Sequence, residues 1–319
     1  MSNIECFQEL KSYVAEKIIG QDRLIDRLLI TLLANGHLLV EGAPGLAKTR
    51  AIKVLSDAIE GDFHRVQFTP DLLPADLTGT DIFRPQDGSF KFERGPLFHN
   101  LVLADEINRA PAKVQSALLE AMAEQQITVG SRTYPLPKLF LVMATQNPIE
   151  QEGTYPLPEA QLDRFLMHVR IDYPDADAER KILALNRCEA MVDEKTAVTL
   201  VTQQQVFKAR NELLGLHMAE SLESYLLELV LATRKPEKYG DDLARWVEFG
   251  ASPRASIALD RCARAYAWLD GRDFVTPNDI QAIAPDVLRH RILLSYEAEA
   301  DGITPDHLIS TLISRIAVP

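Results

Sequence analysis

The chain of 319 residues has few cysteines and no long hydrophobic run. Its three cysteines, Cys6, Cys188 and Cys262, are scattered and odd in number, which favours a reduced, cytoplasmic protein over a disulfide scaffold. No apolar stretch is long enough to cross a bilayer, and the N-terminus lacks the pattern of a signal peptide. The seven histidines show no ligand spacing with cysteine or carboxylate, so we interpret them as structural or surface residues.

Basic residues are also scarce. The chain has 34 lysines and arginines against 46 aspartates and glutamates, a formal net charge of −12. Binding to nucleic acid relies on lysine and arginine to neutralise phosphates, so we do not expect broad nucleic-acid binding, although a local basic pore is compatible with this total. The length supports two packed domains rather than one.

A glycine-bearing loop joins an apolar strand, residues 37–40, to a helix that runs towards residue 59. Such a loop turns backbone N–H groups toward one point at a helix N-terminus, which favours a phosphate. Lys48 would reach the β- and γ-phosphates, and the Thr49 hydroxyl would bind Mg²⁺. Ala47 replaces the second glycine of this pattern, and because alanine is strained at positive φ we expect a helical φ there. The competing interpretation is a chance turn before a helix. The loop reads Gly42-Ala43-Pro44-Gly45-Leu46-Ala47-Lys48-Thr49.

A second apolar run, residues 101–106, ends in Asp105 and Glu106 and is typical of a buried parallel strand. Carboxylates at the carboxyl end of such a strand lie at the edge where α/β sheets bind ligands. Asp105 is then placed to hold hydrated Mg²⁺ through a water, and Glu106 to act as general base on the attacking water. Taken alone, the pair would indicate only a solvated helix start.

A third buried strand, residues 139–145, leads into Gln146-Asn147-Pro148. Asn147 at the strand tip is placed to bind the γ-phosphate or to orient the attacking water. An Asn-Pro dipeptide by itself indicates a turn, and the sensing role depends on its position after a third core strand.

These three segments resemble the Walker A, Walker B and sensor 1 motifs of AAA+ ATPases. Three further stretches, 105–110, 157–165 and 250–254, are similar to the MoxR subfamily, and the resemblance covers nearly the whole chain. It implies ATP and Mg²⁺ as cofactors, a hexameric ring, and a protein client or adaptor, in some members one with a von Willebrand factor A domain.

The resemblance also assigns two arginines. Arg164 corresponds to the arginine finger offered to a neighbouring subunit's nucleotide, and Arg254 to the sensor 2 arginine that contacts the γ-phosphate from the second domain of the same subunit. Ile19 and Gly20 lie in a segment that packs against the adenine, and the cofactor-binding set continues to Arg50. The competing interpretation of both arginines is a pair of surface salt bridges.

The order of the segments predicts a parallel α/β P-loop core over residues 1–172 and a small all-helical lid domain over residues 173–319, with the boundary at Tyr173-Pro174. Helices are expected at 111–124, at about 253–269 and 304–316, and from an N-cap at Thr276. Residues 190–203 are left unassigned. Hairpins are expected at about 83–98 and 126–135. By resemblance they project toward a pore or a client, and simple packing decoration is the alternative.

The predicted function is Mg²⁺-dependent ATP hydrolysis that remodels or matures a protein partner. A nucleic-acid remodelling motor would need a basic hairpin, and Lys91, Arg94, Arg132 and Lys138 supply little charge for one. A nucleotide-dependent binding switch would be favoured if Glu106 or Arg164 were absent, and both are present. A magnesium-chelatase-type subunit, similar in the inserts, would depend on a porphyrin substrate.

Overall fold

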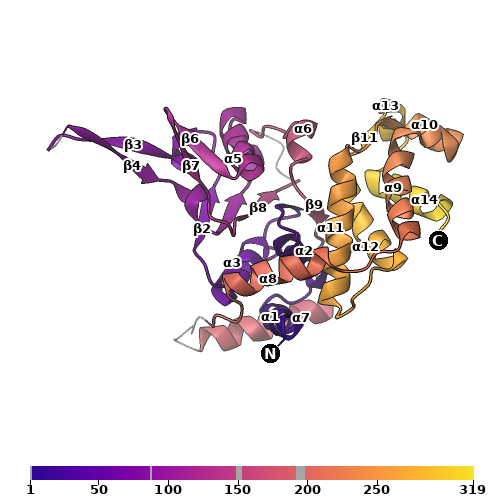
Figure 1. The fold of residues 1–319 in the computed structure, drawn as a ribbon, viewed down its shortest axis with the longest axis horizontal. Coiled ribbons are helices and arrows are strands. Elements are labelled where there is room, and N and C mark those ends of the chain that lie inside the picture. The colour runs from indigo at the N-terminus through magenta and orange to yellow at the C-terminus, as the bar shows by residue number, and fades with distance from the viewer. Residues whose placement is uncertain (1, 87, 149–152, 192–197) are drawn as a thin grey trace.

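Five parallel strands form the sheet of the first domain in the computed structural model, which describes residues 2–86, 88–148, 153–191 and 198–319 (Figure 1). The strand order is β2-β5-β8-β1-β9, and every neighbouring pair is parallel. This sheet confirms the predicted α/β class. The strands are β1 (Leu38–Glu41), β2 (Phe63–Gln67), β5 (Leu101–Asp105), β8 (Leu141–Gln146) and β9 (Met167–Arg170).

Helices cover both faces of the sheet, which explains why its central strands are near-continuous apolar runs. Along β1, Leu38 and Val40 belong to one buried cluster and Leu39 to the other. The first cluster includes α1, α2 and α3, and the second includes α5. The helix predicted at 111–124 is α5, with its apolar stripe buried in the second cluster. These helices are α1 (Asn3–Lys17), α2 (Asp22–Leu33), α3 (Lys48–Ala58) and α5 (Ala112–Glu124).

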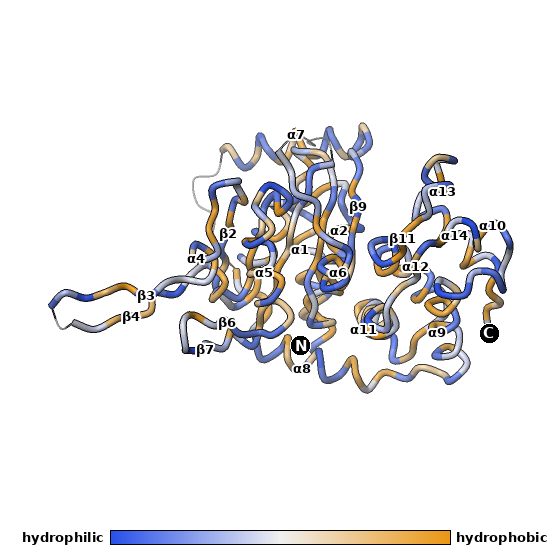
Figure 2. Tube along the Cα trace, turned by 90° about the horizontal axis from the view of Figure 1, so that it is seen from above, coloured by the Kyte–Doolittle hydropathy of each residue, from blue (hydrophilic) through white to orange (hydrophobic). Residues whose placement is uncertain are grey.

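Two hairpins leave the core. Strands β3 (Gly79–Arg84) and β4 (Ser89–Arg94) form the first, which begins earlier than the expected residue 83 because Gly79 pairs with Arg94. Asp87, in its expected Asp-Gly turn, lies outside the described residues. Strands β6 (Gln126–Val129) and β7 (Arg132–Pro135) form the second. Figure 1 and Figure 2 both show the β3–β4 hairpin extending away from the rest of the domain.

The C-terminal region is helical, as predicted. The helices α7 and α8 pack beside the first domain, whereas α9 to α14 form a separate group (Figure 1). The carboxylate of Asp279 accepts a hydrogen bond from the backbone N–H of Thr276, as expected for an acidic residue three positions after the N-cap of α12. The region also holds a short antiparallel pair, β10 (Val247–Phe249) with β11 (Leu293–Leu294), too brief to leave a periodic signal in the sequence.

The helices of this region are α7 (Ala176–Ala190), α8 (Gln203–Leu214), α9 (Glu220–Arg234), α10 (Asp241–Trp246), α11 (Pro253–Leu269), α12 (Pro277–Leu288), α13 (Tyr296–Ala300) and α14 (Pro305–Arg315). Two short helices, α4 (Pro74–Thr78) and α6 (Glu159–Leu162), lie in the first domain. None of the helices in the described part of the chain has the length and apolar character needed to cross a membrane.

Candidate nucleotide-binding site

The phosphate loop connects the end of β1 to the start of α3. Lys48 is the first residue of α3, and its Nζ donates hydrogen bonds to the carbonyl oxygens of Gly42 at 2.5 Å and Gln146 at 3.2 Å. Burial lowers the pKa of Lys48, and the charges of Asp105, Glu106 and Glu41 act in the opposite direction. The ammonium group therefore lies between β1 and β8 and faces the carboxylates of the neighbouring strand ends.

The loop contains two left-handed residues. Gly45 has φ of 84° and Ala47 has φ of 59°. The expectation of a helical φ at Ala47 is wrong, because α3 begins only at Lys48 and the residue before it makes the final turn of the loop. A left-handed alanine costs about 1–2 kcal/mol. Alternation of right- and left-handed residues creates a concave nest of N–H groups that suits an anion such as phosphate.

The second strand end holds the two predicted carboxylates in different environments. Asp105 is only 7% exposed, and it accepts hydrogen bonds from Arg65 Nη2 and Thr145 Oγ1, each at 2.6 Å. Glu106 lies just beyond β5 with φ of 56°, and its carboxylate accepts a hydrogen bond from Gln67 Nε2 at 2.8 Å. Left-handed residues other than glycine are costly and concentrate at functional sites.

Thr145 connects these two carboxylate residues. Its hydroxyl donates to Asp105 Oδ1 at 2.6 Å and accepts from the Glu106 backbone N–H at 2.9 Å, with the residue 1% exposed. We did not predict Thr145, Arg65 or Gln67 from the sequence. Thr145 carries a weak signal, since it ends the third apolar run. The two residues of β2 carry none before the β2–β5 register is known.

The metal donors and the sensor residue lie at the same edge of the sheet. Thr49 is the second residue of α3, and Asn147 follows β8 directly and is buried. A hydroxyl and a carboxylate, such as those of Thr49 and Asp105, are the oxygen donors that Mg²⁺ prefers. The donor set and the nest of N–H groups therefore fit a magnesium–nucleotide complex.

A pocket beside the phosphate loop suits the heterocyclic base of a nucleotide. Gly20 has φ of 77°, and a Cβ there would lie 2.9 Å from side-chain atoms of Ala178 and Pro174. Arg50 lines this pocket, and its guanidinium binds Glu189 of α7 and the carbonyl oxygen of Lys17. The pocket is lined by Lys17, Ile18, Ile19, Gln21, Gly45, Leu46, Ala47, Arg50, Pro174, Ile182, Leu185 and Asn186.

The two predicted arginines lie together at the opposite edge of the sheet. Arg164 and Arg254 line one pocket with residues 35–37, which precede β1, whereas the phosphate loop follows β1. A strand of this length spans about 13 Å. Arg164 Nη1 donates to the carbonyl oxygen of Leu119 at 2.6 Å, and Arg254 Nη1 lies 3.8 Å from Asp163 Oδ2. The structure therefore does not bring Arg254 to the phosphate loop of its own subunit.

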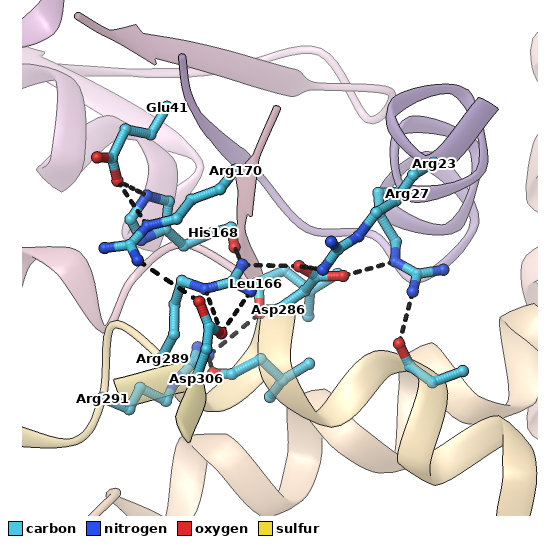
Figure 3. Close-up of polar contacts among 12 residues, drawn as sticks. Arg23, Arg27, Glu41, Leu166, His168, Arg170, Asp286, Arg289, Arg291 and Asp306 are labelled. Atoms are coloured by element: carbon cyan, nitrogen blue, oxygen red, sulfur yellow. Dashed lines mark hydrogen bonds and ion pairs between the residues drawn. The ribbon is translucent and has the colours of Figure 1, made fainter. Parts of the chain in front are cut away.

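Glu41, directly before the loop, begins a chain of charged contacts into the helical region (Figure 3). His168 Nε2 lies 2.9 Å from its carboxylate and Arg170 Nε 3.2 Å away, and the His168 contact is the main reason that the pKa of Glu41 falls to about 2. Arg170 also reaches Asp306 at 3.5 Å. Asp306 accepts from Arg289 at 2.7 Å, so the chain continues into α12.

Buried ion pairs extend this chain to α2. The carboxylate of Asp286 is fully buried and lies 2.7 Å from nitrogen atoms of Arg23, Arg27 and Arg289. Replacing Asp286 would leave the buried guanidinium of Arg27 without its carboxylate, at a cost of about 3–5 kcal/mol. These ion pairs therefore fix the position of α12 against α2.

Comparison with known proteins agrees with this geometry. Residues 37–167 match the ATPase family associated with various cellular activities, and residues 243–312 match the AAA lid domain. The chain is 47% identical over 303 residues to Chaperone MoxR1 of Mycobacterium tuberculosis, covering 95% of this chain and 79% of that protein. It is 36% identical to Protein MoxR of Paracoccus denitrificans over 98% of this chain and 96% of that one.

A solved structure has the same fold throughout. The crystal structure of a Cytophaga hutchinsonii protein superposes with a TM-score of 0.92 at 47% identity, covering 99% of this chain and 96% of that one. The family models account for both the phosphate-loop core and the helical lid, and the relatives extend over almost the full chain. The chain belongs to the MoxR subfamily of AAA+ ATPases.

Proposed function

We propose that this protein hydrolyses ATP with Mg²⁺ and uses the cycle to remodel a protein partner. One observation carries the proposal: Lys48 at the start of α3 meets Asp105 and Glu106 at the end of β5, at one edge of the sheet. Thr145 fixes the two carboxylate residues relative to each other. A cation, a metal-binding carboxylate and a base held in this order are what phosphoryl transfer to water requires.

Each residue has a distinct role in this proposal. ATP with Mg²⁺ supplies, when bound, the anhydride bond and a divalent charge that neutralises phosphate oxygens. Lys48 neutralises the β- and γ-phosphates, and Thr49 and Asp105 hold the metal ion, Asp105 through a water. Glu106 accepts a proton from the attacking water, and Asn147 orients that water or the γ-phosphate.

The nucleotide is held by backbone as well as by side chains. The backbone N–H groups of residues 42–49, apart from Pro44, would surround the phosphates, and the helix dipole of α3 would favour their charge. Ile19 and Gly20 belong to the segment that lines the base pocket. Arg50 shapes that pocket through its ion pair with Glu189, which ties α7 to α3.

Arg164 and Arg254 complete the site of a neighbouring copy. Both lie at the edge of the sheet opposite the phosphate loop, so the nucleotide they serve belongs to another subunit. A permanently charged planar fork suits the spread charge of the transition state. Such a contact is head-to-tail, and head-to-tail contacts form a ring when the rotation between neighbouring copies closes. We propose a hexameric ring, by likeness to the family.

The output of the cycle is mechanical. Chaperone MoxR1 is named as a chaperone, and we extend that class of activity to this chain as remodelling of a protein partner. The β3–β4 hairpin carries exposed Phe83 and Phe90, whose rings lie 5.2 Å apart, and such an apolar pair suits contact with an apolar client segment. A client or adaptor with a von Willebrand factor A domain, and a cytoplasmic location, remain parts of this proposal.

The test is ATP hydrolysis measured against protein concentration for wild type, Glu106→Gln and Arg164→Ala. We expect specific activity that rises with concentration in wild type and is lost in Glu106→Gln, with ATP affinity retained in both variants. Mixing Arg164→Ala with Glu106→Gln subunits should restore activity, because one variant supplies the arginine and the other the base. Activity that is independent of concentration and of Glu106 would contradict the proposal.

A further inference from the structure

The segment that carries Arg164 is held on both sides by one arginine of the lid. The guanidinium of Arg291 is 3% exposed. Its Nε donates to Asp163 Oδ1 at 2.7 Å, its Nη2 to the carbonyl oxygen of Phe165 at 2.6 Å, and its Nη1 to that of Leu166 at 3.2 Å. The backbone before and after Arg164 is therefore fixed to the residues that follow α12.

The carboxylate of Asp163 has a second set of partners. Its Oδ2 accepts a hydrogen bond from Ser252 Oγ at 2.9 Å and lies 3.8 Å from Arg254 Nη1. Ser252 is the N-cap of α11, and Arg254 lies in the first turn of that helix. One carboxylate thus joins the loop of Arg164, the start of α11 and the end of α12.

The pocket around Asp163 is strongly basic. Four arginines line it, and Asp163 is the one acidic residue among its described lining residues. Guanidinium groups placed this close repel one another, and Arg291 is largely removed from water. A carboxylate between them offsets both costs, since a buried charge is tolerated when it is paired and hydrogen-bonded. The arginines are Arg164, Arg254, Arg261 and Arg291.

We propose that Asp163 is a positioning residue that holds Arg164 and Arg254 as a pair facing the nucleotide of the next subunit. This inference rests on the proposed function, in which both arginines act between subunits. Asp163 touches neither phosphate nor water in this scheme. It acts by fixing the loop that carries Arg164 and the start of α11 that carries Arg254, and by making their positions depend on how the lid packs on the core.

The first experiment compares Asp163→Asn with wild type. The amide keeps the shape of the side chain but removes the charge, so the arginine pair loses its fixed spacing. We expect kcat to fall by about 10- to 100-fold, the range that a misplacement of about 1 Å produces. The Kd for a fluorescent ATP analogue, measured in the Glu106→Gln background, should stay within about twofold, because the cradle of the same subunit is untouched. Unchanged kcat would overturn the proposal.

Asp242→Asn is the matched control. Asp242 also pairs with an arginine through both oxygens, Arg315 at 2.6 and 2.7 Å, and it lies in the lid on α10 away from the Arg164 pocket. We expect this variant to keep wild-type kcat. An equal loss of kcat in both variants would mean that any lost ion pair of the lid lowers turnover, and would overturn a specific role for Asp163.

Mixed assemblies separate this proposal from the proposed function. Asp163→Asn subunits keep an intact base, and Glu106→Gln subunits keep an intact arginine pair, so mixing them should restore hydrolysis. Glu106→Gln subunits could restore hydrolysis when mixed with Arg164→Ala but not when mixed with Asp163→Asn. That result would show that Asp163 acts within its own subunit, and it would overturn this proposal without affecting the proposed function. Failure of both mixtures would remove the action between subunits on which both proposals depend.

A second variant covers the case in which Asp163→Asn does not fold. Ser252→Ala removes one of the donors to the Asp163 carboxylate and leaves the buried pair with Arg291 in place. Its thermal unfolding should stay cooperative, with a smaller loss of kcat that mixing with Glu106→Gln subunits reverses. A loss of kcat that mixing does not reverse would overturn the proposal.

Discussion

Replacing Thr145 with valine removes a hydroxyl that forms hydrogen bonds with both carboxylate residues of the proposed hydrolytic site. Valine has nearly the same shape, so the β8 strand and its packing should remain. The change deletes the 2.6 Å hydrogen bond to Asp105 and leaves the backbone N–H of Glu106 without the acceptor it has at 2.9 Å. Since the residue is 1% exposed, water has little access to replace either bond.

The size of the effect follows from these two bonds. A hydrogen bond to a charged group contributes about 1.5–3 kcal/mol, and an unsatisfied buried N–H costs about 1–3 kcal/mol. Arg65 still binds Asp105, so the terms do not add in full. We expect the free energy of unfolding to fall by about 2–4 kcal/mol. Glu106 would also lose the contact that supports its left-handed backbone, and we expect kcat to fall by about 10- to 100-fold.

The assay is urea unfolding together with steady-state ATP hydrolysis, with Thr31→Val as control. Thr31 is also a buried threonine, and its hydroxyl makes a single hydrogen bond, to the carbonyl oxygen of Arg27 at 2.6 Å within α2. We expect that control to lose about 1 kcal/mol and no activity. A Thr145→Val protein with full kcat would refute the role given to this hydroxyl, whatever its stability.

Three further predictions concern the same edge of the sheet. Ala47→Gly should raise the free energy of unfolding in urea by about 1 kcal/mol, because glycine relieves the left-handed strain, and a decrease would contradict that backbone conformation. Glu106→Gln should bind a fluorescent ATP analogue with unchanged Kd while hydrolysis falls by at least about 100-fold; retained hydrolysis would identify another base. The pKa of Glu41 is lowered from 4.5 to about 2, so its ionised form stabilises the fold above pH 4.5 and loses that effect as pH falls toward 2. The stability advantage of wild type over Glu41→Gln should therefore shrink across that interval, and a constant difference would argue against the contact with His168.

The sequence was sufficient for the sheet and for the residues that its strand ends present. Lys48, Asp105 and Asn147 were predicted because each follows or precedes an apolar run at the edge where parallel strands end. Their recognition needed only strand periodicity and a loop pattern. The backbone conformation of Ala47 was predicted wrongly, because a local sequence preference does not decide it. Its left-handed conformation is imposed by the path of the loop into α3, and its own preference points the other way.

Contacts between distant segments could not be predicted. Arg65 reaches Asp105 only because β2 pairs with β5, and nothing local to residue 65 indicates that register. The same holds for Arg291 and Asp163, which are 128 residues apart. Identical chemistry elsewhere in the chain, such as the pair Arg315 with Asp242, has no link to the site. The sequence shows which residues are charged, whereas only the fold shows which residues pair with them.

The proposed base Glu106 and the arginines Arg164 and Arg254 lie at opposite edges of the sheet. This placement supports the proposal that subunits assemble to form the complete site. The strand β1 separates the phosphate loop from the Arg164 pocket, and four residues in a strand span about 13 Å. Ser252 and Arg291 tie the start and the end of the lid's central helices to Asp163, beside that pocket. For Arg254 to approach the phosphates of its own subunit, these contacts would have to break and leave Arg291 buried without its carboxylate. Contact with a second copy requires no such break, because the arginine edge of one subunit and the phosphate-loop edge of the next would supply complementary halves of the proposed site.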